Sequence, residues 1–228
     1  RLLDHGVPLT ATRRHLVAAM RDAVVRRWRD PDHGIWEPRL PPDHHVHTKV
    51  MSWLTLVRCD HVAVRTGDAE LAPPPGLADT IRDDILEHAW DAELGTLTAT
   101  YRGRSLDAAT LWAGLSGMLE PDDERFVATV DMVDRVLRRG PTVDRYHHED
   151  GLPGREGGFN LCTTWHVRAL ALVGRREEAE SLLHAYLGLA GPAGLLAEQH
   201  DPESDRALGN VPQAYSHLGL IEAVLALR

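Results

Sequence analysis

Apolar residues recur at steps of three and four positions along most of the chain. Between Thr10 and Arg29 the repeating apolar positions are Leu16, Val17, Met20, Val24 and Trp28. This spacing places apolar side chains on one face of a helix, and no strict two-residue alternation is long enough to require a sheet. The pattern predicts an all-α fold. The expected helices are Thr10–Arg29, Val46–Arg65, Leu77–Trp90, Leu106–Leu115, Asp122–Leu137, Phe159–Val173, Glu177–Leu189 and Gln213–Leu227.

The connections between these helices alternate between short turns and long loops rich in Gly, Pro and Asp. The long loops include Gly140 to Gly158 and Ala190 to Pro212. We expect these loops to share one end of the fold, where functional residues are usually carried. Because the loops vary in length and no residue set recurs at a fixed spacing, a helical-repeat array is disfavoured. We therefore expect a single domain over residues 1–228.

Composition excludes several partners. The chain has 228 residues and a net charge of −9, from 25 basic and 34 acidic residues. Since no run is rich in Lys and Arg, we expect no nucleic acid partner. No apolar run approaches the roughly 18 residues that span a bilayer, so we expect no membrane partner. Cys59 and Cys162 lie in apolar helical patterns, which favours buried thiols in a reducing compartment and predicts a cytoplasmic protein.

Two glutamates lie in loops that suit acid–base chemistry. Glu37 ends the sequence Gly34-Ile35-Trp36-Glu37, and Glu198 follows Gly194 in the long loop near the end. An indole that excludes water would favour the protonated form of Glu37, as a general acid requires. Each glutamate taken alone is better explained as an ordinary loop carboxylate. As a pair they predict an acid and a base that split an acetal between two sugars with inversion.

Further polar groups surround these loops. The segment from Val143 to Phe159 is glycine-rich and carries Arg145, Glu149, Asp150 and Glu156. Arginine and carboxylate groups bind vicinal sugar hydroxyls, with aromatic rings beneath the sugar face. A solvated charged loop explains this segment equally well. In the approach to the last helix, the side chains of Gln213, Tyr215 and Ser216 are candidate ligands for hydroxyls.

Other chemistries are disfavoured. His44, His45 and His47 follow Asp43, but adjacent histidines seldom converge on one ion, so we expect no metal site. Ser216 and His217 point about 100° apart on a helix and do not form a nucleophile–base pair. Residues 154–158 lack the preceding strand and the Lys-Ser/Thr ending of a phosphate loop.

Taken in order, several segments resemble glycoside hydrolase family 15, which includes glucoamylases, glucodextranases and a branch of bacterial trehalases. Gly34-Ile35-Trp36-Glu37 resembles the loop with the general acid, and His47-Thr48-Lys49-Val50-Met51-Ser52-Trp53 resembles the helix that follows it. Glu156-Gly157-Gly158-Phe159 is similar to the family's mid-chain loop. Leu195-Leu196-Ala197-Glu198-Gln199 is similar to the general-base loop, and residues 209–217 to the entry of the final helix.

The resemblance implies a six-fold α/α barrel of six inner and six outer helices, with the active site at one end. The eight expected helices would be the last eight of the twelve. A barrel without the other four exposes an apolar seam, so we expect an upstream N-terminal segment of the same protein to complete it.

The resemblance also implies roles for individual residues. Glu37 would be the general acid and Glu198 the general base, with no cofactor. The residues expected to contact the substrate are Trp36, Arg39, His47, Lys49, Arg145, Glu149, Asp150, Glu156, Gln213 and Tyr215.

The main expectation for function is an inverting, exo-acting, glucoamylase-like hydrolase that releases glucose from non-reducing ends of an oligosaccharide. The first alternative is a trehalase of the same family, acting on a disaccharide. The second alternative, from another class, is an inactive carbohydrate-binding fragment or scaffold module.

Overall fold

The computed structural model describes residues 3–148, 150–151 and 156–228. Within these residues it contains eight α-helices and two short 3₁₀ helices. The α-helices are α1 (Ala11–Arg27), α2 (Val46–Thr66), α3 (Leu77–Ala89), α4 (Trp112–Leu115), α5 (Glu124–Val136), α6 (Asn160–Leu172), α7 (Arg176–Leu187) and α8 (Ala214–Ala226). The 3₁₀ helices are η1 (Ala69–Leu71) and η2 (Ala108–Leu111).

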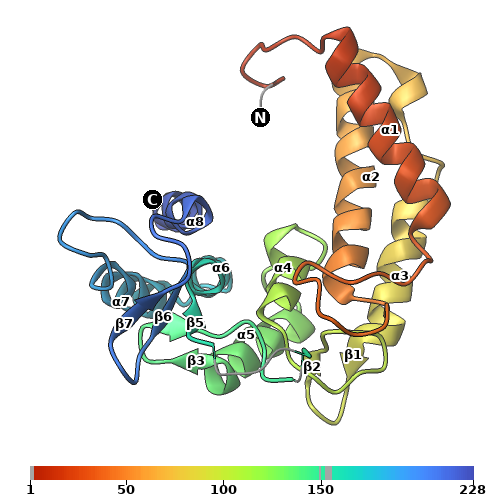
Figure 1. Ribbon diagram of the computed structural model, residues 1–228. Helices are drawn as coiled ribbons and strands as arrows, with labels where there is room; N and C mark the ends of the chain where they lie inside the picture. Colours follow the sequence, from red (N-terminus) through yellow and green to blue (C-terminus); the bar gives the residue numbers. More distant parts are fainter. Residues whose placement is uncertain (1–2, 149, 152–155) are drawn as a thin grey trace.

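The helices form an arc of two layers (Figure 1). Helices α2, α4, α6 and α8 pack against one another in that order and make the inner row. Helices α1 and α3 pack on α2, and α5 and α7 pack on α6, so the odd-numbered helices make the outer row. Successive helices therefore alternate between the rows, which is the arrangement of part of an α/α barrel.

Helix α6 lies at the centre of one half of the arc. It packs against α4, α5, α7 and α8, and for this reason it is buried on nearly all sides. Two of its buried polar side chains, Asn160 and Thr163, form hydrogen bonds with backbone outside the helix. The Thr163 hydroxyl accepts a hydrogen bond from the Val143 N–H at 2.9 Å, as burial of a polar group requires.

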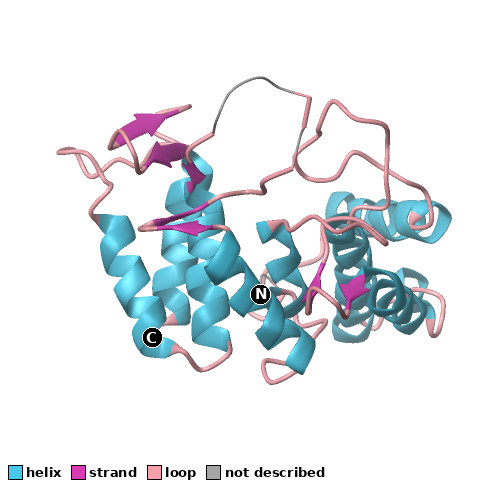
Figure 2. Ribbon diagram, turned by 90° about the horizontal axis from the view of Figure 1, so that it is seen from below, coloured by secondary structure: helices cyan, strands magenta, loops and turns pink. Residues whose placement is uncertain are grey.

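In the part of the chain that the structure describes, seven strands of two or three residues lie between the helices. They are β1 (Trp90–Asp91), β2 (Thr96–Leu97), β3 (Arg138–Arg139), β4 (Thr142–Val143), β5 (Gly158–Phe159), β6 (Gln199–Asp201) and β7 (Arg206–Leu208). Strand β1 pairs with β2, β3 pairs with β4, and β5, β6 and β7 form one antiparallel sheet in that order. Figure 2 shows the β5–β7 sheet and the long loops together on one side of the helices. The expected clustering of long loops at one end is therefore seen.

Local capping explains where several helices begin. The hydroxyl of Thr10 accepts from the Arg13 N–H, and the carboxylate of Asp123 accepts from the Arg125 N–H. Gln213 caps α8 through Tyr215 N–H. The expected helix Leu106–Leu115 is wrong in its first half. Asp107 caps the 3₁₀ helix η2 there instead, and only the last residues form α4.

Both ends of the arc expose apolar side chains. Helix α1 has no buried residue and exposes Leu16 and Met20. Helix α8 exposes the side chains of Tyr215, Leu218, Ile221, Val224 and Leu225. Figure 1 shows these two helices at opposite ends of the arc, with open space between them. The expected apolar seam is present. Among the described residues no helix is long and apolar enough to cross a membrane.

Candidate active site

The first glutamate loop is a tight turn before α2. The Asp32 carboxylate accepts hydrogen bonds from the Gly34 N–H at 2.6 Å and from the Thr48 hydroxyl at 2.7 Å, which ties the loop to the helix. Gly34 has φ +65° and Glu37 has φ +49°. A left-handed conformation is costly for a residue with a side chain, and such strain collects at functional sites.

The two central residues of this turn face opposite ways. Trp36 packs into the protein, whereas Glu37 is exposed. Because Glu37 is exposed, the expectation that the Trp36 indole excludes water from it is not met. The carboxylate instead borders a surface hollow that Asp32, His33 and Thr48 also line. An exposed position leaves Glu37 accessible to a substrate.

Trp36 sits in an aromatic cluster. Its ring lies 5.4 Å from that of Phe159 in an edge-on arrangement, 5.9 Å from Trp165 and 6.5 Å from Tyr146, measured between centroids. Edge-on and tilted geometries at these separations are favourable for aromatic pairs. The cluster attaches the first glutamate loop to β5 and α6.

The second glutamate is held through its backbone and its side chain. Glu198 N–H donates to Asn210 O, and Asn160 N–H donates to Glu198 O, both at 3.0 Å. The Glu198 Oε2 atom accepts from the backbone N–H and from the side-chain Nδ2 of Asn210, again at 3.0 Å each. Two donors on one oxygen orient the carboxylate.

The residue before Glu198 joins two inner helices. The Ala197 carbonyl accepts from the Ser216 hydroxyl of α8 at 2.7 Å and from Asn160 Nδ2 of α6 at 2.8 Å. The neighbouring Leu196 carbonyl accepts from the Gln213 N–H at 2.9 Å. The backbone beside Glu198 is therefore fixed by the amino-terminal ends of α6 and α8.

Phe159 brings the two glutamate loops together. On one side its ring contacts Trp36, the residue before Glu37. On the other side its backbone pairs with Gln199, the residue after Glu198, where β5 meets β6. Glu37 and Glu198 thus flank a single structural unit at the start of α6.

Arg145 lies beside this unit. Its guanidinium carbon is 5.1 Å from the Trp36 ring centroid, 4.9 Å from that of Tyr146 and 5.3 Å from that of Phe159. Arg145 also forms a two-pronged ion pair with Glu156, of which the Nε to Oε2 bond is 2.9 Å. A cation over aromatic faces, paired with a carboxylate, offers both polar and apolar contacts to a sugar.

Tyr146 and Asp150 extend the same surface. The Tyr146 hydroxyl donates to Asp150 Oδ2 at 3.0 Å, and burial together with Asp150 raises the Tyr146 pKa above its usual range. The Asp150 carbonyl accepts from the Arg39 N–H at 3.1 Å. Arg39 itself is exposed. Glu149 lies outside the described residues, so its expected role stays a prediction.

His47 and Lys49 lie on α2. His47 is half-buried, its ring stands edge-on 6.4 Å from that of Trp112, and burial lowers its pKa to about 4. Lys49 is buried and donates from Nζ to the carbonyls of Trp28 at 2.7 Å and Asp30 at 2.6 Å. Lys49 thus holds the end of α1, and the structure does not bring it to the glutamate pair.

The last two expected contacts lie at the start of α8. Gln213 caps the helix through the Tyr215 N–H and holds the Glu198 loop through Leu196. Tyr215 is 65% exposed on the open face of α8.

Three polar residues of the site escape prediction from sequence. Asn160 and Asn210 bind the Glu198 loop, and Asp107 binds Trp36. For Asn210 a signal exists, because Gly209-Asn210-Val211-Pro212 is a polar turn directly before a helix. Among the described residues no three His, Cys, Asp or Glu side chains are grouped as a metal site.

A helical arc with inner and outer rows, and with carboxylate-bearing loops at one end, is the arrangement of an α/α-barrel glycoside hydrolase. The sequence model of Glycosyl hydrolases family 15 matches residues 2–225. The chain belongs to this family, as the sequence predicts.

Several proteins similar to this chain are named trehalases. The chain is 42% identical over 208 residues to the trehalase of Mycobacterium tuberculosis (strain ATCC 25618 / H37Rv). The aligned region covers 90% of this chain and 30% of that protein. It is 35% identical over 196 residues to the trehalase of Thermoplasma volcanium (strain ATCC 51530 / DSM 4299 / JCM 9571 / NBRC 15438 / GSS1). This alignment covers 85% of this chain and 32% of that protein. The chain therefore spans about a third of the length of these relatives.

Solved structures share the fold at low sequence identity. A structure described as wild-type glycosidase superposes with a TM-score of 0.84 at 21% identity, covering 99% of this chain and 62% of that one. A bacterial glucoamylase complexed with acarbose superposes with a TM-score of 0.76 at 17% identity. The superposition covers 93% of this chain and 37% of the glucoamylase chain. These likenesses confirm the predicted all-α fold of the α/α-barrel type.

Proposed function

We propose that the complete protein that carries this chain hydrolyses an α-glucoside with inversion, using Glu37 as the general acid and Glu198 as the general base. One observation carries the proposal. Phe159 contacts Trp36 through its ring and Gln199 through its backbone, so a neighbour of each glutamate packs against the same residue, and this supports a shared site. Family membership supports the same chemistry.

The reaction needs no covalent intermediate. Glu37 donates a proton to the glycosidic oxygen as the bond from that oxygen to the anomeric carbon breaks. Glu198 takes a proton from water as the water oxygen bonds to the same carbon from the opposite face. Because Asn210 donates twice to Oε2 of Glu198, we assign Oε1 as the oxygen that accepts this proton.

The names of the relatives point to trehalose as the substrate. The matched relatives from Mycobacterium tuberculosis and Thermoplasma volcanium are named trehalases. This supports the alternative expectation of a trehalase over the main expectation of a glucoamylase-like enzyme. In trehalose both anomeric carbons are in the α configuration, so attack by water inverts one of them and leaves the other unchanged.

Proton NMR of the first products tests both mechanism and substrate. With trehalose as substrate, we expect equal initial amounts of β-glucose and α-glucose before mutarotation. Initial α-glucose alone would contradict inversion. Rapid hydrolysis of maltose or longer maltodextrins, with trehalose untouched, would contradict the choice of substrate.

Replacement of each carboxylate tests the assignment of roles. We expect Glu37→Gln and Glu198→Gln each to lower kcat by about 10²–10⁴-fold, the usual contribution of a general acid or base. Tm measurements show whether each variant is folded. A folded Glu198→Gln protein with full activity would remove the base assignment. Binding of glucose by the wild-type protein without any turnover would favour the carbohydrate-binding alternative.

We further propose that additional helices of the same protein cover the exposed faces of α1 and α8. Two findings support this. The chain spans about a third of the length of its named relatives, and apolar side chains such as Leu218, which is 57% exposed, line the open ends of the arc. Covering apolar surface of this kind stabilises a fold.

A further inference from the structure

Asp107 is a buried acid that contacts two members of the aromatic cluster, Trp36 and Tyr146. The residue is only 6% exposed, and burial raises the pKa of its carboxyl to about 6, although hydrogen bonds from Ala109 and Trp36 oppose this rise. A buried carboxyl is unfavourable unless it is well bonded. The burial of Asp107 is therefore costly and calls for a structural or functional explanation.

The carboxylate of Asp107 binds the residue before the proposed acid. Trp36 Nε1 donates to Oδ2 at 2.9 Å and contacts Oδ1 at 3.1 Å, while the Ala109 N–H donates to Oδ1 at 2.7 Å. The backbone is also secured, since Asp107 pairs with Tyr146 and the Ala108 N–H donates to Arg145 O at 2.9 Å. Asp107 is thus a fixed point against which the indole is held.

Glu37 directly follows the anchored residue Trp36 in the chain. Its own side chain is exposed and its backbone is left-handed, so neither burial nor a relaxed conformation holds it in place. The adjacent Trp36 attaches the turn to the core. Rotation or withdrawal of the indole would move the Glu37 carboxyl, and a displacement of about 1 Å at a reacting group can cost 10²-fold in rate.

We propose that Asp107 is a positioning residue for protonation of the leaving group, acting on Glu37 through the Trp36 indole. This inference rests on the proposed function, because it takes Glu37 to be the acid. Asp107 touches neither the substrate nor the proton that is transferred.

An asparagine at this position is not a neutral replacement. Its single carbonyl oxygen satisfies the Ala109 N–H, and its amide group then points N–H atoms at the Trp36 N–H, so that two donors face each other. Asp107→Asn should therefore displace the indole almost as much as Asp107→Ala. Trp36→Phe removes the opposing donor, and in that background Asp107→Asn should have only a small additional effect.

Leaving-group dependence separates positioning of the acid from a general structural role. Trehalose requires a proton on its leaving oxygen, whereas α-glucosyl fluoride releases fluoride with little protonic assistance. With the complete protein, we expect Asp107→Asn to lower kcat about 10²-fold on trehalose but only a few-fold on the fluoride, with KM little changed. Glu37→Gln should show the same contrast between the two substrates.

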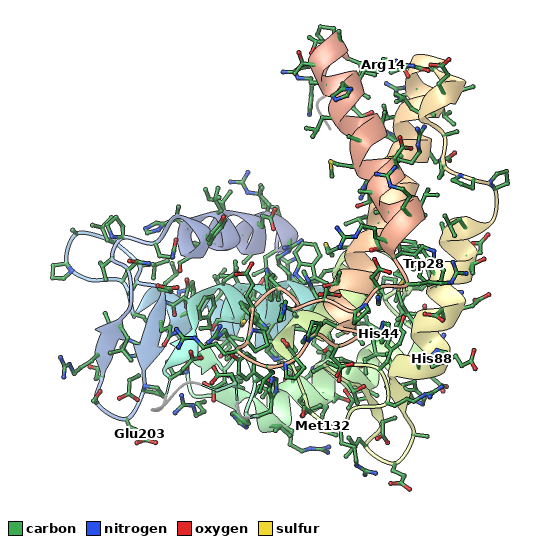
Figure 3. All side chains as sticks on the ribbon, turned by 45° about the vertical axis from the view of Figure 1, so that its right-hand side comes forward. Arg14, Trp28, His44, His88, Met132 and Glu203 are labelled. Atoms are coloured by element: carbon green, nitrogen blue, oxygen red, sulfur yellow. The ribbon has the colours of Figure 1, made fainter. Side chains whose placement is uncertain are left out.

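Asp68 supplies a matched control. It caps the 3₁₀ helix η1 as Asp107 caps η2, but its ion-pair partner Arg14 lies at the far end of α1 (Figure 3). We expect Asp68→Ala to lower Tm without changing the ratio of rates on the two substrates.

Two outcomes separate this inference from the proposed function. In the first outcome, Glu37→Gln keeps its rate on the fluoride, but Asp107→Asn loses the same factor in kcat on both substrates. Positioning by Asp107 is then overturned and the acid assignment stands. In the second outcome, Glu37→Gln itself loses the same factor in kcat on both substrates. The acid assignment then fails, and the role of Asp107 fails with it. Should Asp107→Asn not fold, Trp36→Phe removes the same hydrogen bond from the other partner, and equal loss on both substrates overturns the inference.

Discussion

Gly209 lies against the proposed base and has no room for a side chain. A Cβ atom there would stand 2.7 Å from Glu198 Oε2 and 2.9 Å from Glu198 Cβ, and the backbone has φ +71°. Both the conformation and the space favour glycine. The absence of a side chain at this residue lets the next one, Asn210, donate twice to the carboxylate.

We expect Gly209→Ala to displace the Glu198 carboxylate and lower kcat by about 10²-fold, as for a misplaced catalytic group. Gly174→Ala is the matched control, because Gly174 has φ +83° but nothing lies within 4 Å of its Cβ position. Both variants should lose about 1–2 kcal/mol of stability from the left-handed backbone. Steady-state kinetics and urea denaturation distinguish the two effects, and equal kcat values for both variants would contradict the steric argument.

Individual residues are predictable from sequence only where their neighbours are close in the chain. Glu37 and Glu198 stand out because each lies in a glycine-containing loop outside the helical pattern. Asp107 does not, because its partner Trp36 is 71 positions away and only folding brings the two together. Lys49 looks like a polar residue of the site in sequence, yet the fold directs its amine to the carbonyls at the end of α1.

At the scale of elements, His47 links the inner helices α2 and α4 through Trp112. Burial lowers the pKa of His47 to about 4, below the roughly 6.5 of an unfolded histidine. Between these two pH values the unfolded chain binds a proton that the folded chain does not. His47 therefore makes stability fall as pH decreases through this window.

We expect His47→Asn to flatten the pH dependence of the unfolding free energy between about pH 6.5 and 4, by at most about 3 kcal/mol. Asp107, whose pKa is raised to about 6, acts with the opposite sign, so the informative quantity is the difference between variant and wild type. Urea denaturation at several pH values measures it. A replacement of the exposed His184 on α7 is the control, and identical slopes for wild type and His47→Asn would contradict the prediction.

Helices follow from the sequence more reliably than strands. The expected helix Val46–Arg65 matches α2 (Val46–Thr66) to one residue, because apolar positions recur through several turns and Gly67 ends the helix. Strands such as β5 (Gly158–Phe159) are too short to show alternation, and their pairing is decided by the distant β6. The helix expected from Leu106 fails in its first turns because the Asp107 carboxylate starts a 3₁₀ turn instead.

At the scale of the whole molecule, the arc has an open edge along α8. Ile221 on this edge is 55% exposed, and Leu187 on the outer helix α7 is 42% exposed. Exposure alone predicts that both positions tolerate a charge. If further helices of the same protein cover α8, Ile221 becomes a core position and Leu187 remains at the surface.

We expect Ile221→Asp to destabilise the complete protein by about 3 kcal/mol or more, since it would bury an unpaired charge. Leu187→Asp should change stability by only about 0.5 kcal/mol, as for a surface substitution. Chemical denaturation of the two variants provides the comparison. Equal and small effects would show that the face of α8 is not covered.

The anchoring of the Ala197 carbonyl to α6 and α8 has a consequence for how such a scaffold diversifies. Residues 191–195 and 203–205, on either side of the Glu198 loop and its strand β6, are exposed. Because helices hold the backbone next to Glu198, insertions and deletions in these flanking segments can accumulate without moving that carboxylate. With Glu198 as the proposed base, the chemistry would be inherited unchanged while the rim of the site is remodelled for a different sugar.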